Sequence, residues 1–155
     1  MPNISLSVND EFFKLNIESR LLLVELIREK LGLTGTHIGC DTSQCGACVV
    51  QVDGAPVKSC SMLAIQADGT KILTIEGVEK EDGLAPIQAA FHKHHGLQCG
   101  FCTPGMIMTA SAFLRDNPQP TEEDVRLELE GNICRCTGYQ NIIIAILDAA
   151  KAMRE

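Results

Sequence analysis

The sequence contains no tryptophan, and aromatic residues make up only 4% of its 155 positions. It has no apolar run long enough to span a membrane and no run of Lys or Arg. The stretch Lys93-His94-His95 is too short for a phosphate-binding patch and the net charge is −7, so nucleic acid is not expected as a partner. A hydrophobic content of 45% with 21% charged residues still indicates a globular chain.

No secretory signal is recognisable, because Met1-Pro2-Asn3-Ile4-Ser5 lacks the charged and apolar regions of such a segment. We therefore expect a cytoplasmic protein whose thiols stay reduced. In that compartment, eight cysteines are more typical of metal or cluster ligands than of disulfides. Two small cores stiffened by metal sites would also fit the shortage of aromatic residues.

The first half of the sequence predicts strands arranged around one helix. Alternating patterns indicate strands, leucines at i, i+4 spacing indicate a helix that ends at Gly32, and Asp53-Gly54 is a strong hairpin turn. The predicted strands cover residues 4–8, 12–17, 47–52, 55–59 and 71–75, and the helix covers 21–31. This pattern predicts a small α+β domain with a cysteine-rich loop.

The second half predicts four helices, at residues 85–95, 104–117, 121–130 and 140–153. A charged, glycine-flanked stretch precedes them, so we divide the chain into a domain at 1–77, a linker at 78–83 and a domain at 84–155. Thr103 and Thr121 are the predicted N-caps, with Asp124 close to completing a capping box at the second. The short connections favour an up-and-down four-helix bundle.

Four cysteines of the first half follow the spacing Cys40-x4-Cys45-x2-Cys48, with Cys60 further along the chain. This is the spacing of plant-type [2Fe–2S] ferredoxins. If the hairpin turns at residues 53–54, Cys48 lies opposite residue 59. Cys60 then arrives beside Cys48 at the open end of the hairpin, next to the loop that carries the other two cysteines.

The other four cysteines form a C-x2-C pair, Cys99 and Cys102, and a C-x-C pair, Cys134 and Cys136. Residues two apart point away from each other on a helix, so the C-x-C pair needs a bent loop. In an up-and-down bundle the first and third connections lie at the same end, which would bring the two pairs together. Spacing alone leaves open whether this four-thiolate site holds a cluster or a zinc ion.

Three stretches, GCDTSQCGAC (39–48), GLQCGFCTPG (96–105) and GNICRCTGYQN (131–141), resemble one family: the iron–sulfur subunits of the molybdenum hydroxylases, the xanthine oxidase family. Within that family, residues 33–39 and 57–60 are most similar to the small subunit of aerobic carbon monoxide dehydrogenase. Gln44 departs from this likeness, since His is expected there.

The resemblance implies a β-grasp, plant-type ferredoxin-like domain followed by a four-helix domain. Each would hold one [2Fe–2S] cluster, the first on Cys40, Cys45, Cys48 and Cys60 and the second on Cys99, Cys102, Cys134 and Cys136. Electrons would pass from molybdenum to the helical-domain cluster, then to the ferredoxin-domain cluster, then to FAD. The chain itself would be a non-catalytic electron-transfer subunit of a molybdenum-dependent oxidoreductase.

The resemblance also implies partners. A large subunit would hold the molybdenum–pterin cofactor, in its cytosine dinucleotide form, and a medium subunit would hold FAD, in a dimer of heterotrimers. Residues matching Gln98, Cys99 and Cys136 would contact the pterin. We expect carbon monoxide as the substrate of the complex, with an N-heteroaromatic compound or an aldehyde as the alternative.

Two hypotheses of other classes compete with this one. A free-standing ferredoxin-like carrier would be a monomer with a polar surface on the helical domain. A zinc-stabilised structural module would be colourless, because it would lack the visible absorption of iron–sulfur clusters.

Overall fold

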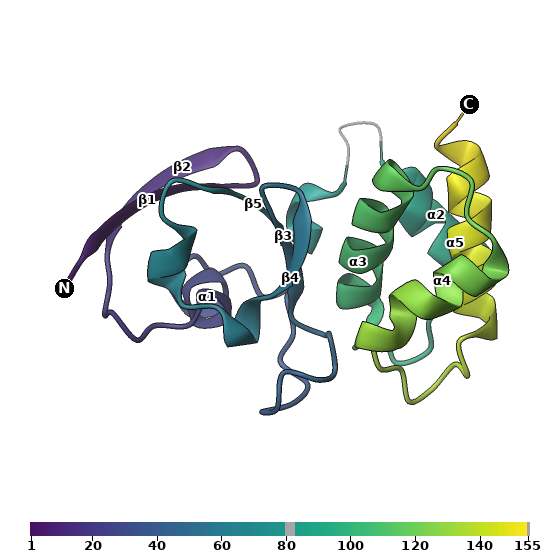
Figure 1. Ribbon diagram of the computed structural model, residues 1–155, viewed down its shortest axis with the longest axis horizontal. Coiled ribbons are helices and arrows are strands. Elements are labelled where there is room, and N and C mark those ends of the chain that lie inside the picture. Colours follow the sequence, from purple (N-terminus) through teal and green to yellow (C-terminus); the bar gives the residue numbers. More distant parts are fainter. Residues whose placement is uncertain (80–82, 155) are drawn as a thin grey trace.

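The computed structural model describes residues 1–79 and 83–154 (Figure 1). Residues 80–82 of the predicted linker, and Glu155 at the end of the predicted helical domain, therefore lie outside the described residues. The described chain has a sheet half, residues 1–79, and a helical half, residues 83–154, which lie side by side. Mixed strands and helices give an α+β fold.

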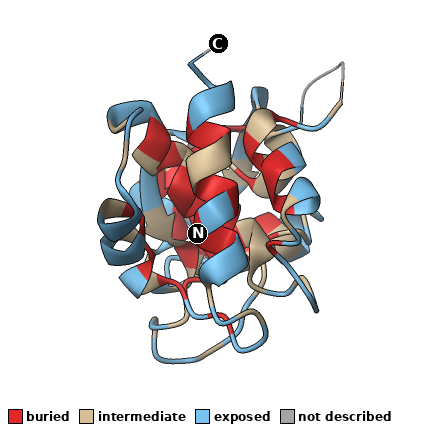
Figure 2. Ribbon diagram, turned by 90° about the vertical axis from the view of Figure 1, so that its right-hand side faces the viewer, coloured by how far each residue is buried: buried red, intermediate tan, exposed pale blue. Residues whose placement is uncertain are grey.

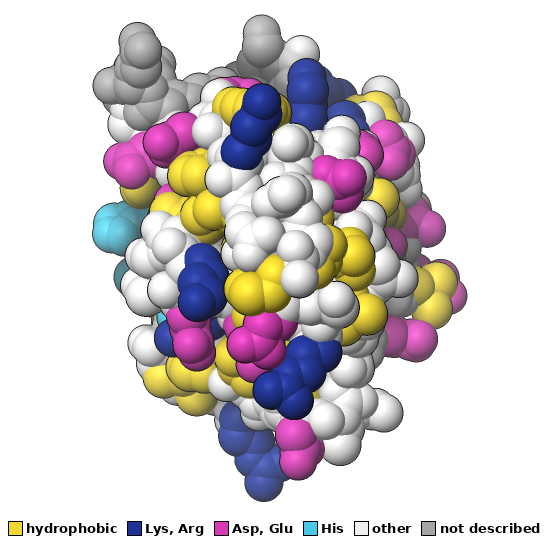
Figure 3. Space-filling model, turned by 90° about the vertical axis from the view of Figure 1, so that its left-hand side faces the viewer, with side chains coloured by type: hydrophobic (Ala, Val, Ile, Leu, Met, Phe, Trp, Pro, Cys, Tyr) yellow, Lys and Arg dark blue, Asp and Glu magenta, His cyan; other side chains and the backbone are white. Residues whose placement is uncertain are grey.

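The sheet half has five strands in the order β2-β1-β5-β3-β4. The strands are β1 Asn3–Val8, β2 Glu11–Asn16, β3 Val49–Val52, β4 Ala55–Lys58 and β5 Lys71–Leu73. β1 and β5 run parallel, and the other neighbouring pairs are antiparallel. Leu6 and Val50 of the sheet pack against Leu23 and Leu26 of the following helix in one buried cluster. The outer face of this half, away from the helices, mixes charges of both signs with hydrophobic side chains (Figure 3).

The predicted hairpin register is confirmed. Val52 pairs with Ala55 across the turn, Val49 pairs with Lys58, and the Ser59 N–H donates to the Cys48 carbonyl at 3.3 Å. Cys48 and Cys60 therefore both stand at the open end of the hairpin.

The helix predicted at 21–31 is present but irregular. α1 spans only Leu23–Glu25 and continues as the π-helical turn η1, Leu26–Lys30. The Arg28 guanidinium donates to the Thr34 and Thr36 carbonyls at 2.9 and 2.7 Å, so the end of this helix is tied to the loop that leads to the first cysteines. Three short 3₁₀ turns complete this half: η2 Ser59–Ser61, η3 Ala64–Ala67 and η4 Ile75–Gly77.

The helical half contains α2 Pro86–Lys93, α3 Thr103–Asp116, α4 Glu122–Glu128 and α5 Gln140–Ala152, with the 3₁₀ turn η5 Leu129–Gly131 after α4. Their facing sides share one buried core that includes Phe91, Met106, Ile107, Ile142 and Ile146. Figure 2, which looks onto this half, shows the buried residues on the sides that the helices turn toward one another. Among the described residues, no helix combines the length and the apolar character that crossing a membrane requires.

One predicted cap is confirmed and one is wrong. The Thr121 hydroxyl accepts from the Asp124 N–H at 3.2 Å. The Thr121 N–H in turn donates to the Asp124 carboxylate at 2.8 Å, which completes a capping box. Thr103 does not cap α3, because the chain already turns into helical conformation at Cys102, which is the N-cap. Thr103 is thus the first helical residue, and its hydroxyl oxygen is buried without a hydrogen-bond partner.

Candidate cysteine sites

The loop before β3 brings Cys40 and Cys45 together. The Cys45 N–H donates to the Cys40 sulfur and the Ala47 N–H donates to the Cys45 sulfur, each at 3.5 Å. Backbone N–H groups of Cys45, Thr42 and Gln44 lower the pKa of the Cys40 thiol to about 6, because they stabilise its thiolate form. The loop therefore presents a sulfur that is ready to act as a thiolate ligand.

Cys48 and Cys60 form the second pair of this site. Cys48 directly precedes β3 and is buried, while Cys60 lies in η2 directly after β4. Burial raises the pKa of the Cys48 thiol to about 11, and the adjacent Cys60 thiol adds to the rise. The Lys58 ammonium donates to the Ser43 and Gln44 carbonyls at 3.1 Å each, which fastens the cysteine loop to the hairpin.

The structure also brings together the C-x2-C and C-x-C pairs, as the bundle topology predicted. The sulfurs of Cys99 and Cys136 lie 3.5 Å apart. Burial raises the pKa of the Cys102 thiol to about 12, with the neighbouring Cys134 thiol adding to the rise. Burial opposes ionisation of Cys134, but hydrogen bonds from the Thr137 hydroxyl and from the Cys136 and Thr137 amides outweigh it and lower its pKa.

Two helix N-termini stand beside this second site. α3 begins directly after Cys102, and α5 begins at Gln140, four residues after Cys136. Unpaired N–H groups at a helix N-terminus carry partial positive charge, which stabilises nearby negative charge. In addition, the Phe101 N–H donates to the Cys99 sulfur at 3.5 Å. The local field therefore favours an anionic group held by these sulfurs.

Tyr139 is a site residue, although the sequence by itself suggests no more than a core residue with its hydroxyl at the surface. Its hydroxyl accepts from the Cys134 N–H at 2.9 Å and donates to the Asn132 carbonyl at 3.2 Å. These two hydrogen bonds hold the backbone of the C-x-C loop in its bent conformation. Its backbone is left-handed, with φ of 70°, a conformation that is uncommon for a bulky residue. An aromatic residue between a C-x-C pair and a helix was the available sequence signal, but the φ angle is visible only in the structure.

The two sites lie next to each other. The Ile133 N–H, in the C-x-C loop, donates to the Cys45 carbonyl at 2.8 Å, and the Asn132 amide donates to the Gly46 carbonyl at 3.2 Å. The His37 ring stacks on Phe101 with centroids 4.6 Å apart. A cavity of about 180 Å³ is lined by Cys45 of the first site and by all four cysteines of the second.

The donor sets fit [2Fe–2S] clusters. Such a cluster needs four thiolates, two on each of its two irons. Each site offers its thiols as two pairs: Cys40 with Cys45 and Cys48 with Cys60 in the first, Cys99 with Cys136 and Cys102 with Cys134 in the second. Among residues 1–79 and 83–154, no three or more His, Cys, Asp or Glu side chains are grouped so that they could hold one metal ion.

The remaining predicted site residues lie at the surface around the second site. Gln98, Cys99 and Cys136 are exposed, and Arg135 is exposed between its two cysteine neighbours while also lining the cavity. The second site therefore opens toward the outside through its Cys99–Cys136 edge, whereas Cys134 is buried.

Comparisons with known proteins agree with this arrangement. Residues 74–147 match the family model described as a [2Fe-2S] binding domain, and residues 8–84 match the model of the 2Fe-2S iron-sulfur cluster binding domain. The chain is 49% identical to caffeine dehydrogenase subunit gamma of Pseudomonas sp. (strain CBB1), over 92% of this chain and 87% of that protein. It is 47% identical to the nicotine 6-hydroxylase small subunit of Paenarthrobacter nicotinovorans, over 94% and 88%.

A solved structure is also similar to this chain, in both sequence and fold. The crystal structure of quinoline 2-oxidoreductase from Pseudomonas putida 86 contains a chain with 46% identity and a TM-score of 0.95, covering 99% of this chain and 96% of that one. Matches to both cluster-binding models and to subunits of such oxidoreductases span nearly the whole sequence. The chain therefore belongs to the family of small iron–sulfur subunits of the molybdenum hydroxylases.

Proposed function

We propose that this chain relays electrons between a molybdenum–pterin centre in a large partner subunit and FAD in a medium partner subunit. The observation that carries the proposal is the pairing of two four-thiol sites through the Cys45–Ile133 backbone hydrogen bond. A chain of closely spaced one-electron centres is what a relay needs, because it couples two-electron chemistry at one end to a flavin at the other.

The proposed ligands are Cys40, Cys45, Cys48 and Cys60 for the first [2Fe–2S] cluster, and Cys99, Cys102, Cys134 and Cys136 for the second. Each cluster, when bound, exchanges one electron at a time. The chain adjusts the cost of the added negative charge through the backbone amides that point at sulfur and the N-termini of α3 and α5. The match of residues 74–147 to a [2Fe-2S] model supports a cluster over zinc at the second site.

The surface around the second site supports its contact with a partner. Phe101 is 48% exposed and Ile133 is 52% exposed, and both flank the exposed sulfurs of Cys99 and Cys136. Apolar side chains around a functional edge mark an interaction surface. We propose that the large subunit covers this edge and that Gln98, Cys99 and Cys136 contact the pterin there, in its cytosine dinucleotide form.

The rest of the proposed assembly follows the family pattern. The FAD-binding medium subunit would face the first site, and the complex would be a dimer of heterotrimers in the cytoplasm. The relatives named above are a subunit gamma and a small subunit, which supports a subunit over a free-standing carrier. We also propose that residues 1–77 form a β-grasp domain and residues 84–155 a four-helix bundle, with a linker at 78–83.

The large subunit selects the substrate, so the evidence on the substrate comes from the relatives of this chain and not from its own residues. The sequence resemblance predicted carbon monoxide, with N-heteroaromatic compounds or aldehydes as the alternative. The names of the relatives reported above refer to caffeine, nicotine and quinoline, which are nitrogen heterocycles. These names support an N-heteroaromatic substrate over carbon monoxide.

The test is anaerobic mixing of the purified complex with one candidate substrate at a time: quinoline, caffeine or carbon monoxide. Reduction of both clusters, seen by electron paramagnetic resonance (EPR) during turnover, would support the relay and identify the substrate class. A substrate that is turned over while both clusters stay oxidised would contradict the relay. Turnover of carbon monoxide alone would contradict the N-heteroaromatic assignment.

A further inference from the structure

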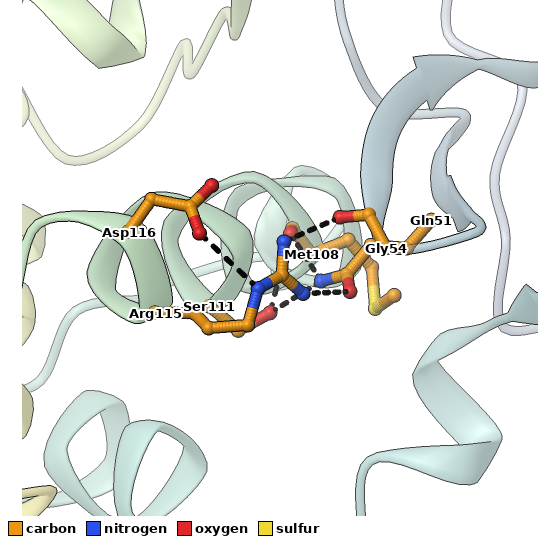
Figure 4. Close-up of polar contacts among 6 residues, drawn as sticks. All are labelled: Gln51, Gly54, Met108, Ser111, Arg115 and Asp116. Atoms are coloured by element: carbon orange, nitrogen blue, oxygen red, sulfur yellow. Dashed lines mark hydrogen bonds and ion pairs between the residues drawn. The ribbon is translucent and has the colours of Figure 1, made fainter.

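Gln51 is a polar residue in the middle of an otherwise apolar strand. It lies in β3 between Val50 and Val52 and is only 4% exposed. Val50 belongs to the core of the sheet half, so the alternation of a strand turns Gln51 to the opposite face, toward α3. There the Gln51 amide nitrogen donates to the Met108 carbonyl at 3.0 Å and to the Ser111 hydroxyl at 2.9 Å (Figure 4).

Arg115 lies one turn further along α3 and reaches the same strand pair. Its guanidinium donates to the Gly54 carbonyl in the hairpin turn at 2.7 Å and to the Gln51 side-chain oxygen at 3.5 Å (Figure 4). The Gln51 amide is thus used at both its nitrogen and its oxygen, and its three partners, Met108, Ser111 and Arg115, all lie on α3.

The elements joined by these contacts are the ones that lead directly out of the two cysteine sites. Cys102 is the N-cap of α3, and Cys48 is the residue before β3. Any slide or tilt of α3 on β3 would therefore move Cys102 relative to Cys48.

Hydrophobic packing between α3 and the sheet is non-directional, so it discriminates only weakly between neighbouring positions of the helix along the strand. Hydrogen bonds to a buried amide discriminate more sharply, because a buried polar group that loses its partners bears the full cost of desolvation. If α3 moved by one turn along β3, the Gln51 amide would lose both the Met108 carbonyl and the Ser111 hydroxyl. The side chain therefore selects one alignment of the helix on the strand.

We propose that Gln51 is a positioning residue that fixes the placement of α3 on β3, and thereby the separation and relative orientation of the two cysteine sites. This inference rests on the proposed function, because it matters for electron transfer only if both sites hold clusters. It concerns the geometry between the sites and leaves the ligands of each cluster unchanged.

The experiment compares the parent chain, Gln51→Leu and Gln66→Leu, each isolated with its native partner subunits and reduced with dithionite. Gln66→Leu is the control, because Gln66 lies in η3, away from α3, and among the described residues its side chain forms a hydrogen bond with no group other than the Leu63 N–H at the N-cap of η3, from which it accepts. EPR reports the magnetic interaction between two reduced clusters, which depends on their separation and orientation, and iron analysis reports their occupancy. A purely structural role would lower stability without changing the interaction in the folded protein.

We expect Gln51→Leu to keep the iron content and the individual signals of both clusters, but to shift and broaden the interaction between them, with Gln66→Leu unchanged. Ser111→Ala removes one of the two acceptors and should give a smaller shift in the same direction, which preserves the test if Gln51→Leu fails to fold. If Gln51→Leu folds, or if only Ser111→Ala does, and the interaction between its clusters is identical to that of the parent, the inference is overturned. A parent sample without two cluster signals would instead overturn the proposed function, and the inference with it.

Discussion

Replacing Gly105 by alanine should force the two halves of the molecule apart. Gly105 lies in the first turn of α3, against the backbone of the first cysteine loop. A Cβ atom built there would overlap the Gly46 carbonyl oxygen and lie 3.1 Å from the Ala47 Cα atom. Both neighbours are backbone atoms, so no side chain can rotate away to make room.

The expected magnitude is a balance of two effects. Alanine in place of glycine favours a helix by about 1 kcal/mol, whereas overpacking a tight contact costs roughly 1–3 kcal/mol, occasionally more. Because the contact here is with rigid backbone, we expect the upper end of that cost and a net loss of about 2 kcal/mol. For a chain of this size, each kcal/mol lowers the melting temperature by roughly 2–4 °C.

The assay is thermal unfolding of the isolated chain together with its iron content. Gly131→Ala is the matched control, because its added Cβ atom would meet only the Lys58 ammonium, at 3.9 Å. The control should stay within about 0.5 kcal/mol of the parent. If Gly105→Ala kept its iron and were as stable as the parent or more stable, the close contact between α3 and the cysteine loop would not require glycine at this position.

Three further predictions concern the second site and the helical half. Cys136→Ala should remove about half of the iron and one of the two EPR signals; a variant that kept both clusters and full activity would refute its assignment as a ligand. Tyr139→Phe leaves the Cys134 N–H without the hydroxyl that accepts from it at 2.9 Å, at a cost of about 1–3 kcal/mol, so iron should be lost faster to a chelator; an unchanged rate would count against the role of this hydroxyl. The Lys93 ammonium and His94 each contact the Asp148 carboxylate at 2.8 Å and lower the pKa of that carboxyl. The stability that these contacts contribute is therefore present above the pKa of about 3.9 that the carboxyl has in the unfolded chain, and it is lost as pH falls through the lowered pKa of the folded chain. Asp148→Asn should therefore be less stable than the parent near neutral pH, by no more than about 1 kcal/mol, and the difference measured by denaturant unfolding should vanish in acid; a difference that persisted there would exclude this ion pair as its cause.

The sequence was sufficient to predict the structure wherever a local rule determines the geometry. A two-residue turn at Asp53-Gly54 sets the register of the hairpin, and this register brings Cys60 beside Cys48. Short helix connections put the first and third loops at one end, which is where Cys99 meets Cys136. These relations depend on neighbours in sequence or on simple topology.

The sequence was insufficient wherever distant segments decide the conformation. Thr103 has the residue type of an N-cap, but the preceding cysteine loop had already turned into helical conformation at Cys102. Nothing near Gln51 in the sequence indicates its role, because its partners on α3 lie 57, 60 and 64 positions away. The need for glycine at position 105 likewise comes from Gly46, on a different element.

The central claim is that the eight cysteines hold two [2Fe–2S] clusters, and metal analysis tests it most directly. Iron, acid-labile sulfide and zinc would be measured per chain on the isolated protein, with EPR of a dithionite-reduced sample. The proposal predicts about four irons and four sulfides per chain with two distinct signals. About two irons with one zinc would contradict it, because the second site would then be structural and the relay would end at the first.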